Sequence, residues 1–362
     1  MVRSRKRART AIRKTPGLVL ILAAGAVIAG FFLLLGPGAG GPTGGGEKEQ
    51  PAATSPTPTP TPTAPQSGAP SEGAGVAQRD LASGPEGTEA PQRNQGAFFT
   101  LSVDPSKVDQ GDLAVIRVGP SGSARIDRVE ISGLGLPARF SRIGNDFIAL
   151  VGIPDTSKPA KRTFTVKGLA GDKEGTVSAS LEITPKKFPE ERLYVPKEQN
   201  DLLSDPGIEK DQEKINGVKS RSGGEPLWTG PLLMPVDGEI TTEYGLIRYV
   251  NDVDDGRHSG LDIAAKSGTP VLAANNGRVV LAENLILTGY TVIIDHGLGL
   301  MTSYSHLSRI DVPVGASVKT GQKIGAVGST GFSTGPHLHW TVSIGTTPTN
   351  PRPLLKDGLL GR

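Results

Sequence analysis

The chain has 362 residues, which is long enough for two domains, and its 49 glycines and 30 prolines indicate many turns and linkers. It contains no cysteine, which excludes disulfides, a cysteine nucleophile and cysteine-bound metals. The formal net charge of +3 arises from seven basic residues within positions 1–14. The remainder holds 32 basic against 36 acidic side chains, so no nucleic-acid-binding surface is expected.

The N-terminus has the pattern of a membrane anchor. A basic cytoplasmic tail, residues 1–16, precedes an apolar segment at 17–36 with eighteen consecutive uncharged residues from Leu18 to Leu35. Such a helix would be about 27 Å long, close to the thickness of the hydrocarbon core of a bilayer. Basic flanking residues stay in the cytoplasm, so the segment is expected to cross the cell membrane once. The rest of the chain is then expected on the extracytoplasmic side. The alternative is a signal peptide that is cleaved to release a secreted protein, but the apolar run is longer than usual for one.

Residues 37–97 are predicted to form a disordered linker. They contain no aromatic residue, and positions 54–65 read TSPTPTPTPTAP. Such a composition buries too little apolar surface to fold. Alternating Thr and Pro favour an extended polyproline conformation, so this segment is expected to act as a spacer.

The rest of the chain predicts a mainly β fold in two domains. Short alternating runs between turn residues predict a small β-sandwich at 98–188. A charged connector follows at 189–227 with a short helix at 208–218, then a second β-rich domain at 228–353 and a C-terminal tail at 354–362. Expected strands are 101–103, 113–118, 126–131, 147–151, 164–166, 177–183, 270–274, 277–282, 291–296, 300–307 and 337–344.

All five histidines lie in the second β-rich domain, at positions 258, 296, 306, 337 and 339. Histidine is the commonest side-chain metal ligand and the base best matched to neutral pH. Period two places His337 and His339 on one face of a strand. His258, Asp262 and a distant histidine would supply three ligands and leave a fourth position for water, which is the pattern of a catalytic zinc site.

Other patterns are ambiguous or weaker. Alternation predicts a common face for Thr302, Tyr304 and His306, where His306 could carry protons or belong to the core. His296 has the same ambiguity, with a structural role favoured. Ser333 lies in a G-x-S-x-G sequence, but no strand-to-helix turn is expected there, so we discount it as a nucleophile.

The ordered set of motifs resembles the lysostaphin/LytM-type zinc metallopeptidases, a family of murein endopeptidases. The segments that carry this resemblance, spread over about 235–351, are His258-Ser-Gly-Leu-Asp262, Gly268-Thr-Pro-Val271, Tyr304-Ser-His306-Leu307, Gly321 to Gly328 and Gly335-Pro-His337-Leu-His339-Trp340. The resemblance implies a LytM-like antiparallel, barrel-like β-sheet domain. The region at 98–188 resembles the N-terminal β-sandwich of membrane-anchored members of this family.

The resemblance also implies a role for each matching residue. His258, Asp262 and His339 match the zinc ligands, whereas His306 and His337 match the two catalytic histidines that are not ligands. The expected function is hydrolysis of peptide bonds in the stems or cross-bridges of peptidoglycan, with zinc as the cofactor. The alternative is a protein that binds zinc and the cell wall, or activates other hydrolases, without hydrolysing anything itself. Peptidoglycan and the membrane are the expected partners, and the sequence does not identify any protein partner.

Overall fold

The computed structural model describes residues 92–96, 98–356 and 359–360. The predicted cytoplasmic tail, the predicted membrane helix at 17–36 and most of the predicted linker lie outside these residues. Within them, no helix is long and apolar enough to cross a membrane.

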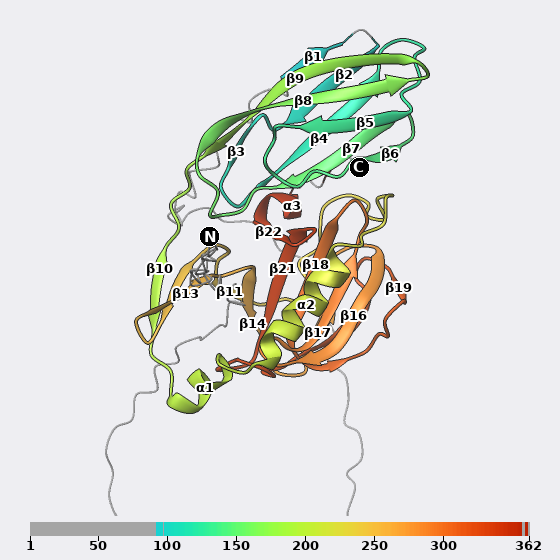
Figure 1. Cartoon of the computed structure of the whole chain (residues 1–362). Helices are drawn as coiled ribbons and strands as arrows, with labels where there is room; N and C mark the ends of the chain where they lie inside the picture. The colour runs from blue at the N-terminus through green and yellow to red at the C-terminus, as the bar shows by residue number, and fades with distance from the viewer. Residues whose placement is uncertain (1–91, 97, 357–358, 361–362) are drawn as a thin grey trace, which may run out of the picture. The chain divides into compact units, whose positions relative to one another are not determined.

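Two facing sheets make up residues 92–184, called here the two-sheet region (Figure 1). The five strands of the first sheet are antiparallel and lie in the order β1 (Gln92–Gln95), β2 (Phe99–Asp104), β4 (Leu113–Pro120), β7 (Asp146–Gly152) and β6 (Ser141–Ile143). The four strands of the second sheet lie in the order β3 (Lys107–Asp109), β9 (Lys173–Thr184), β8 (Ala160–Ala170) and β5 (Arg128–Ser132). Each strand expected between 101 and 183 coincides with or overlaps one of these, so a mainly β structure is confirmed here.

Alternating side chains build the core between these two sheets. On β2, Phe99 and Leu101 are completely buried, and on β9, Leu181 and Ile183 are buried between exposed or half-buried neighbours. They belong to one apolar cluster drawn from both sheets. Two sheets that enclose such a core have the arrangement of a β-sandwich.

Strand β7 is buried on both faces, which explains its unbroken apolar sequence. The two ends of the run Phe147–Val151 face the core of the two-sheet region, whereas Ile148 and Leu150 join the apolar cluster of the C-terminal sheet. The backbone N–H of Asn350 also donates to the carbonyl oxygen of Gly111 at 2.7 Å. The two-sheet region and the C-terminal sheet therefore share buried apolar surface.

The connector contributes a strand that the sequence did not predict. Strand β10 (Glu190–Leu193) pairs in parallel with β12 (Ile247–Val250), which pairs with β13 (Val253–Arg257) in a small three-stranded sheet. These strands have four or five residues each and carry several charges, so hydrophobic alternation does not reveal them.

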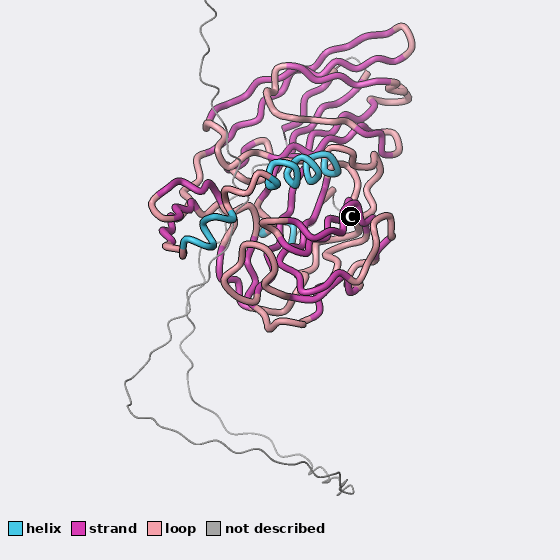
Figure 2. The backbone as a smooth tube through the Cα atoms, turned by 60° about the horizontal axis from the view of Figure 1, so that its bottom comes forward, coloured by secondary structure: helices cyan, strands magenta, loops and turns pink. Residues whose placement is uncertain are grey.

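Two helices follow in the connector, α1 (Lys197–Leu202) and α2 (Gly207–Lys219) (Figure 2). Helix α2 confirms the expected helix at 208–218. Its side chains Ile215 and Val218 pack against an apolar cluster that includes Leu281 and Ile293 of the C-terminal sheet.

The C-terminal sheet has ten antiparallel strands. Seven of them form one path, in the order β11 (Glu239–Thr242), β14 (Leu261–Ala264), β21 (His337–Ile344), β18 (Leu300–Ile310), β17 (Gly289–Asp295), β16 (Gly277–Leu285) and β19 (Ser317–Val318). The other three are β15 (Pro270–Leu272), which pairs with β20 (Lys323–Val327), and β22 (Thr347–Thr349), which pairs with β21; β20 also pairs with β18. The short helix α3 (Arg352–Lys356) follows. Among the described strands β11 and β19 do not pair with each other, so the sheet is open and branched rather than barrel-like.

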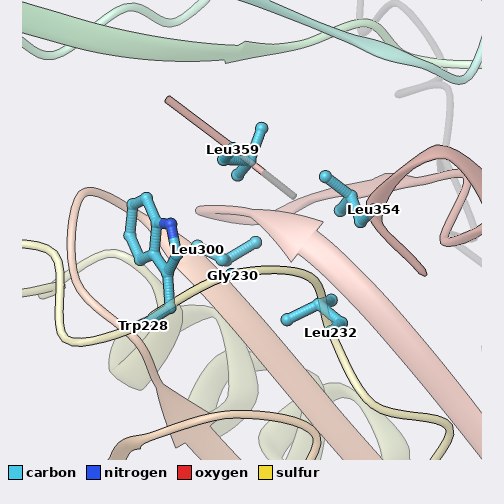
Figure 3. A pocket seen from close by; sticks show the side chains of 6 residues that line it. All are labelled: Trp228, Gly230, Leu232, Leu300, Leu354 and Leu359. Atoms are coloured by element: carbon cyan, nitrogen blue, oxygen red, sulfur yellow. The ribbon is translucent and has the colours of Figure 1, made fainter. Parts of the chain in front are cut away.

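One face of this sheet packs on a large apolar cluster that includes Leu261, Leu338 and Trp340. Leucines from α3 and the chain's end, together with Trp228, line a small apolar pocket beside Leu300 (Figure 3). None of the five histidines lines this pocket, which is a packing gap and not the place where the polar residues gather.

Candidate metal centre

Strand β21 separates polar from apolar side chains. Leu338 and Trp340 are completely buried in the apolar cluster on one face, which leaves His337 and His339 for the other. Asp262 on β14 lies directly opposite His339 in the strand register. Opposite residues of an antiparallel pair point to the same face of the sheet, so Asp262 meets His339 there.

His258, Asp262 and His339 converge into a group that could hold a metal ion. His258 Nε2 lies 3.0 Å from His339 Nδ1 and 3.0 Å from Asp262 Oδ2, and His339 Nδ1 lies 2.8 Å from Asp262 Oδ1. Tetrahedral zinc with bonds of about 2.0–2.1 Å places its ligand atoms about 3.3 Å apart. The triangle of atoms therefore fits zinc after a slight expansion, and three ligands leave one tetrahedral position open.

Hydrogen bonding prepares His258 and Asp262 to act as ligands. His258 Nδ1 lies 2.9 Å from the carbonyl oxygen of Glu243, which can only accept, so this nitrogen carries the proton and Nε2 offers its lone pair. Burial alone would raise the pKa of the Asp262 carboxyl, but the neighbouring His258 and His339 more than offset it and lower the pKa below its usual range. Asp262 is therefore ionised at neutral pH.

His339 directs Nδ1 toward the metal-binding group, whereas His258 directs Nε2 toward it. Its Nδ1 faces His258 and Asp262, and its Nε2 lies 3.0 Å from Thr341 Oγ1 and 3.2 Å from Ser259 Oγ. Burial lowers the pKa of His339 to about 4, against a smaller opposing effect of Asp262, so the ring is neutral. A neutral ring can offer Nδ1 to a metal only if Nε2 carries the proton.

His306 and His337 lie beside this group without belonging to it. Their ring centroids are 4.8 Å apart, and the centroids of His306 and His339 are 6.1 Å apart. His306 Nδ1 donates to the carbonyl oxygen of Thr330, and His337 Nδ1 to that of Gly335, each at 2.8 Å. The Nε2 atoms of both rings are buried and have no hydrogen-bond partner in the described structure. Two lone pairs therefore remain for a reacting molecule.

A β-bulge turns the His306 side chain toward the metal-binding group. The prediction that Thr302, Tyr304 and His306 share one face is therefore wrong for His306. Tyr304 pairs with Val292 and Leu307 with Tyr290, so two residues of β18, Ser305 and His306, oppose one residue of β17. His306 has φ of 60°, in the left-handed region that non-glycine residues seldom adopt. Tyr304 consequently lies in the apolar core, and His306 does not share its face.

His296 is the fifth histidine, and the structure places it apart from the other four. Its Nδ1 donates to the carbonyl oxygen of Asn276, and its Nε2 bonds to Thr302 Oγ1, both at 2.7 Å. Burial lowers the pKa of His296 to about 4. Both ring nitrogens are satisfied, which agrees with the structural role favoured for this residue.

The G-x-S-x-G sequence forms a loop before β21, as expected, with no helix after it. Ser333 Oγ donates to the carbonyl oxygen of Gly335 at 2.9 Å. This serine therefore has neither the strand-to-helix turn nor the free hydroxyl of a hydrolase nucleophile.

The groups that orient the histidines were not predicted from the sequence. Thr341 follows His339 by two residues on the same strand face, so the period of two could have identified it. Ser259 and the carbonyl groups of Glu243 and Thr330 come from loops or irregular strand ends, and no sequence pattern indicates them.

Comparisons with known proteins agree with this geometry. Residues 256–351 match the family model described as peptidase family M23. A crystal structure described as that of an M23 peptidase from Pseudomonas aeruginosa superposes with a TM-score of 0.51 and 30% sequence identity, and it covers 69% of this chain and 95% of that one.

Two curated relatives also match part of the chain. The peptidoglycan DD-endopeptidase ShyA of Vibrio cholerae is 45% identical over 93 residues, which is 26% of this chain and 22% of ShyA. The murein hydrolase activator EnvC of Escherichia coli is 34% identical over 146 residues, which is 40% of this chain and 34% of EnvC. The chain thus spans about a fifth to a third of these curated relatives. Taken with the match over nearly all of the Pseudomonas structure, these similarities show that the chain belongs to peptidase family M23.

Proposed function

We propose that the chain is a zinc-dependent endopeptidase that hydrolyses peptide bonds in the stem or cross-bridge peptides of peptidoglycan. One observation carries this proposal: three convergent ligand atoms lie beside two buried imidazole nitrogens that have no hydrogen-bond partner among the described residues. Structural zinc sites usually have four protein ligands, whereas catalytic sites keep one position open. Unpaired buried nitrogens cost stability, and a catalytic role explains why they are present.

In this mechanism His258, Asp262 and His339 hold the zinc ion. When bound, zinc lowers the pKa of water and polarises a carbonyl group, which favours hydrolysis near neutral pH. One of the His306 and His337 rings, each held by a carbonyl oxygen at Nδ1, would accept the proton of the attacking water at Nε2. That ring would then transfer the proton to the nitrogen of the leaving amine, and the other ring would donate a hydrogen bond to the oxyanion when its own Nε2 carries a proton.

The comparisons support the substrate class. ShyA is named for peptidoglycan endopeptidase activity, and the present chain has a His-Asp-His group with two further histidines beside it. EnvC is named as an activator of murein hydrolases, which supports the second candidate, a protein that regulates hydrolases without hydrolysing peptidoglycan itself. The complete site favours hydrolysis over this activator role.

The N-terminal sequence adds a proposal about location. A membrane helix at 17–36 and a linker at 37–97 would tether the described regions to the outer face of the cell membrane. The twelve-residue Thr/Pro tract alone could extend about 37 Å. The tether would direct the enzyme to the inner layers of the wall. The domain limits 98–188, 189–227 and 228–353 are part of the same proposal.

Purified peptidoglycan and cross-linked muropeptide dimers provide the test. The protein should convert dimers to monomers with intact glycan, as detected by mass spectrometry, and a chelator should abolish the reaction until zinc is restored. His306→Ala and His337→Ala should retain zinc and lose about 10²–10⁴-fold in turnover.

Ser343→Ala is the matched control, because Ser343 is buried on the same strand as His337 and its hydroxyl has no partner within the part of the chain that the structure describes. This variant should keep both zinc and turnover. Zinc binding without any peptidoglycan cleavage would favour the activator role instead, and an active metal-free protein would contradict the metal site.

A further inference from the structure

We propose that the hydroxyl groups of Thr341 and Ser259 are positioning groups that set the tautomer and ring orientation of His339. This inference rests on the proposed function, because it concerns a ligand of the proposed zinc ion. Neither residue belongs to the metal-binding group or to the catalytic pair. Both act through His339.

The four other histidines show why His339 is exceptional. In His258, His296, His306 and His337, a backbone carbonyl oxygen accepts a hydrogen bond from Nδ1. A carbonyl oxygen can only accept, so the backbone itself fixes the tautomer of each of these rings. Only His339 directs Nδ1 toward the ligand group, and its other nitrogen meets side chains instead of the backbone.

The two hydroxyl groups approach His339 Nε2 from different elements: Thr341 from strand β21 and Ser259 from the loop before β14. Thr341 Oγ1 lies 3.0 Å from this nitrogen, and Thr341 is a buried residue on the same face of β21. Ser259 Oγ, from the residue after His258, lies 3.2 Å from the nitrogen and 3.4 Å from Thr341 Oγ1. Together they form a small polar site that can accept the Nε2 proton.

The carboxylate of Asp262 makes this acceptor necessary. It lies 2.8 Å from His339 Nδ1, so it favours the tautomer that carries the proton on Nδ1. That tautomer cannot bind a metal through Nδ1. The hydroxyl groups of Thr341 and Ser259 favour the opposite tautomer, which leaves Nδ1 with its lone pair. Without them, zinc must displace a proton that Asp262 stabilises.

Substitutions at Thr341 separate this role from simple space filling. Thr341→Val keeps the shape of the side chain and removes the hydroxyl group, whereas Thr341→Ser keeps the hydroxyl group and removes a methyl group. Loss of a group that orients a metal ligand typically lowers metal affinity by about 10–100-fold. We expect a loss in this range for Thr341→Val, a smaller loss for Ser259→Ala, and recovery close to wild type for Thr341→Ser.

The zinc affinity of the full-length protein should be measured by competition with a chromogenic chelator. The control is Ser343→Ala, two residues further along the same strand, which removes a buried hydroxyl group that has no partner in the described residues. This variant should bind zinc as the wild type does. Thermal melting of the zinc-free proteins verifies that each variant folds. If Thr341→Val does not fold, the zinc affinity of Ser259→Ala tests the role of the hydroxyl groups.

A spectroscopic measurement tests the tautomer directly. The chain has five histidines, so selective ¹⁵N labelling of histidine gives a small set of ring signals from the zinc-free protein. In the wild type, His339 should show the proton on Nε2, and in Thr341→Val it should shift toward Nδ1. Wild-type affinity and an unchanged tautomer in Thr341→Val and Ser259→Ala would overturn the inference. A wild-type protein that does not bind zinc would instead contradict the proposed function.

Discussion

The two-sheet region and the C-terminal sheet bury different kinds of side chain. Among the described residues of the two-sheet region, Ser157 is the one buried polar side chain, and the core is otherwise apolar. The C-terminal sheet buries all five histidines and Asp262, together with several serines and threonines. Burying a polar group costs free energy unless hydrogen bonds compensate it. The chain therefore accepts this cost in the region that matches the model of peptidase family M23.

Strand β21 combines both kinds of burial within a few residues. Its Leu338 and Trp340 stabilise the sheet from one face, while the histidines on the other face depend on hydrogen bonds for their orientation. Substitutions in the apolar cores should therefore change stability, whereas substitutions in the polar group should change chemistry.

Asp262→Asn should have the largest effect. The side chain keeps its shape but loses the charge that binds the metal, so we expect loss of stoichiometric zinc and of turnover with a nearly unchanged fold. Zinc analysis after dialysis measures this effect. Asp295→Asn is the matched control, because Asp295 is also a buried carboxylate of this sheet and accepts hydrogen bonds from Ser222 and Gly223. The Asp295→Asn variant should lower the free energy of unfolding by about 1–3 kcal/mol and still bind zinc. If Asp262→Asn retained its zinc, the proposed metal site would be wrong.

Phe164→Ala should give the opposite result. Phe164 is 1% exposed in the core of the two-sheet region, and its truncation should cost about 3–5 kcal/mol in unfolding free energy. Zinc content per folded molecule should not change. Denaturant titration measures the loss, with the exposed Lys161 on the same strand as the site of a control substitution to Ala. A loss of zinc in folded Phe164→Ala would show that the separation between the two regions is incomplete.

The stability of the zinc-free protein should fall on acidification. Burial lowers the pKa of His296 to about 4, of His306 to about 3 and of His339 to about 4. Unfolded histidine has a pKa of about 6.5, so between roughly pH 4 and 6.5 the unfolded state binds more protons than the folded state. Each such group therefore removes up to about 1.4 kcal/mol per pH unit as the pH falls through this interval.

Chemical unfolding at a series of pH values measures this slope. His296→Asn should reduce the slope without changing zinc affinity, because His296 is outside the metal group. The two-sheet region contains no histidine, and burial raises the pKa of its Asp112 and Asp155 carboxyl groups, so it should not add to the loss of stability on acidification. A stability that does not change between pH 6.5 and 5 would show that these rings are already protonated in the folded protein.

Glu174→Gln should have the smallest effect. Glu174 forms an ion pair with Lys167 across β8 and β9 at 2.7 Å, but about half of its side chain is exposed. Such surface pairs typically contribute between 0 and about 1 kcal/mol, and salt weakens them further. Unfolding at low and high salt should detect at most this difference, with zinc binding unaffected. A larger loss would mean that surface charge supports the two-sheet region more than its apolar core suggests.

Sequence patterns predicted the regular parts of this molecule. The apolar run 147–151 and the alternation of His337 to Trp340 both follow directly from the side-chain period of a strand. The left-handed conformation of His306 and the extra residue beside it arise from the pairing of β17 with β18. That pairing is a tertiary property, so the sequence wrongly predicted a common face with Tyr304. The sheet of β10, β12 and β13 escaped for the same reason, since segments more than fifty residues apart pair there.

The bulge at His306 makes the residue count of β18 a requirement of the proposed chemistry. Deleting one residue between Tyr304 and Leu307 would restore even pairing with β17 and leave no extra residue to turn a side chain toward His337. Homologues and designed variants should therefore tolerate exchanges of side chains along this strand more readily than any change in its length. Glycine and asparagine are the replacements at 306 best suited to the backbone, and both would preserve the path of the strand while removing the imidazole.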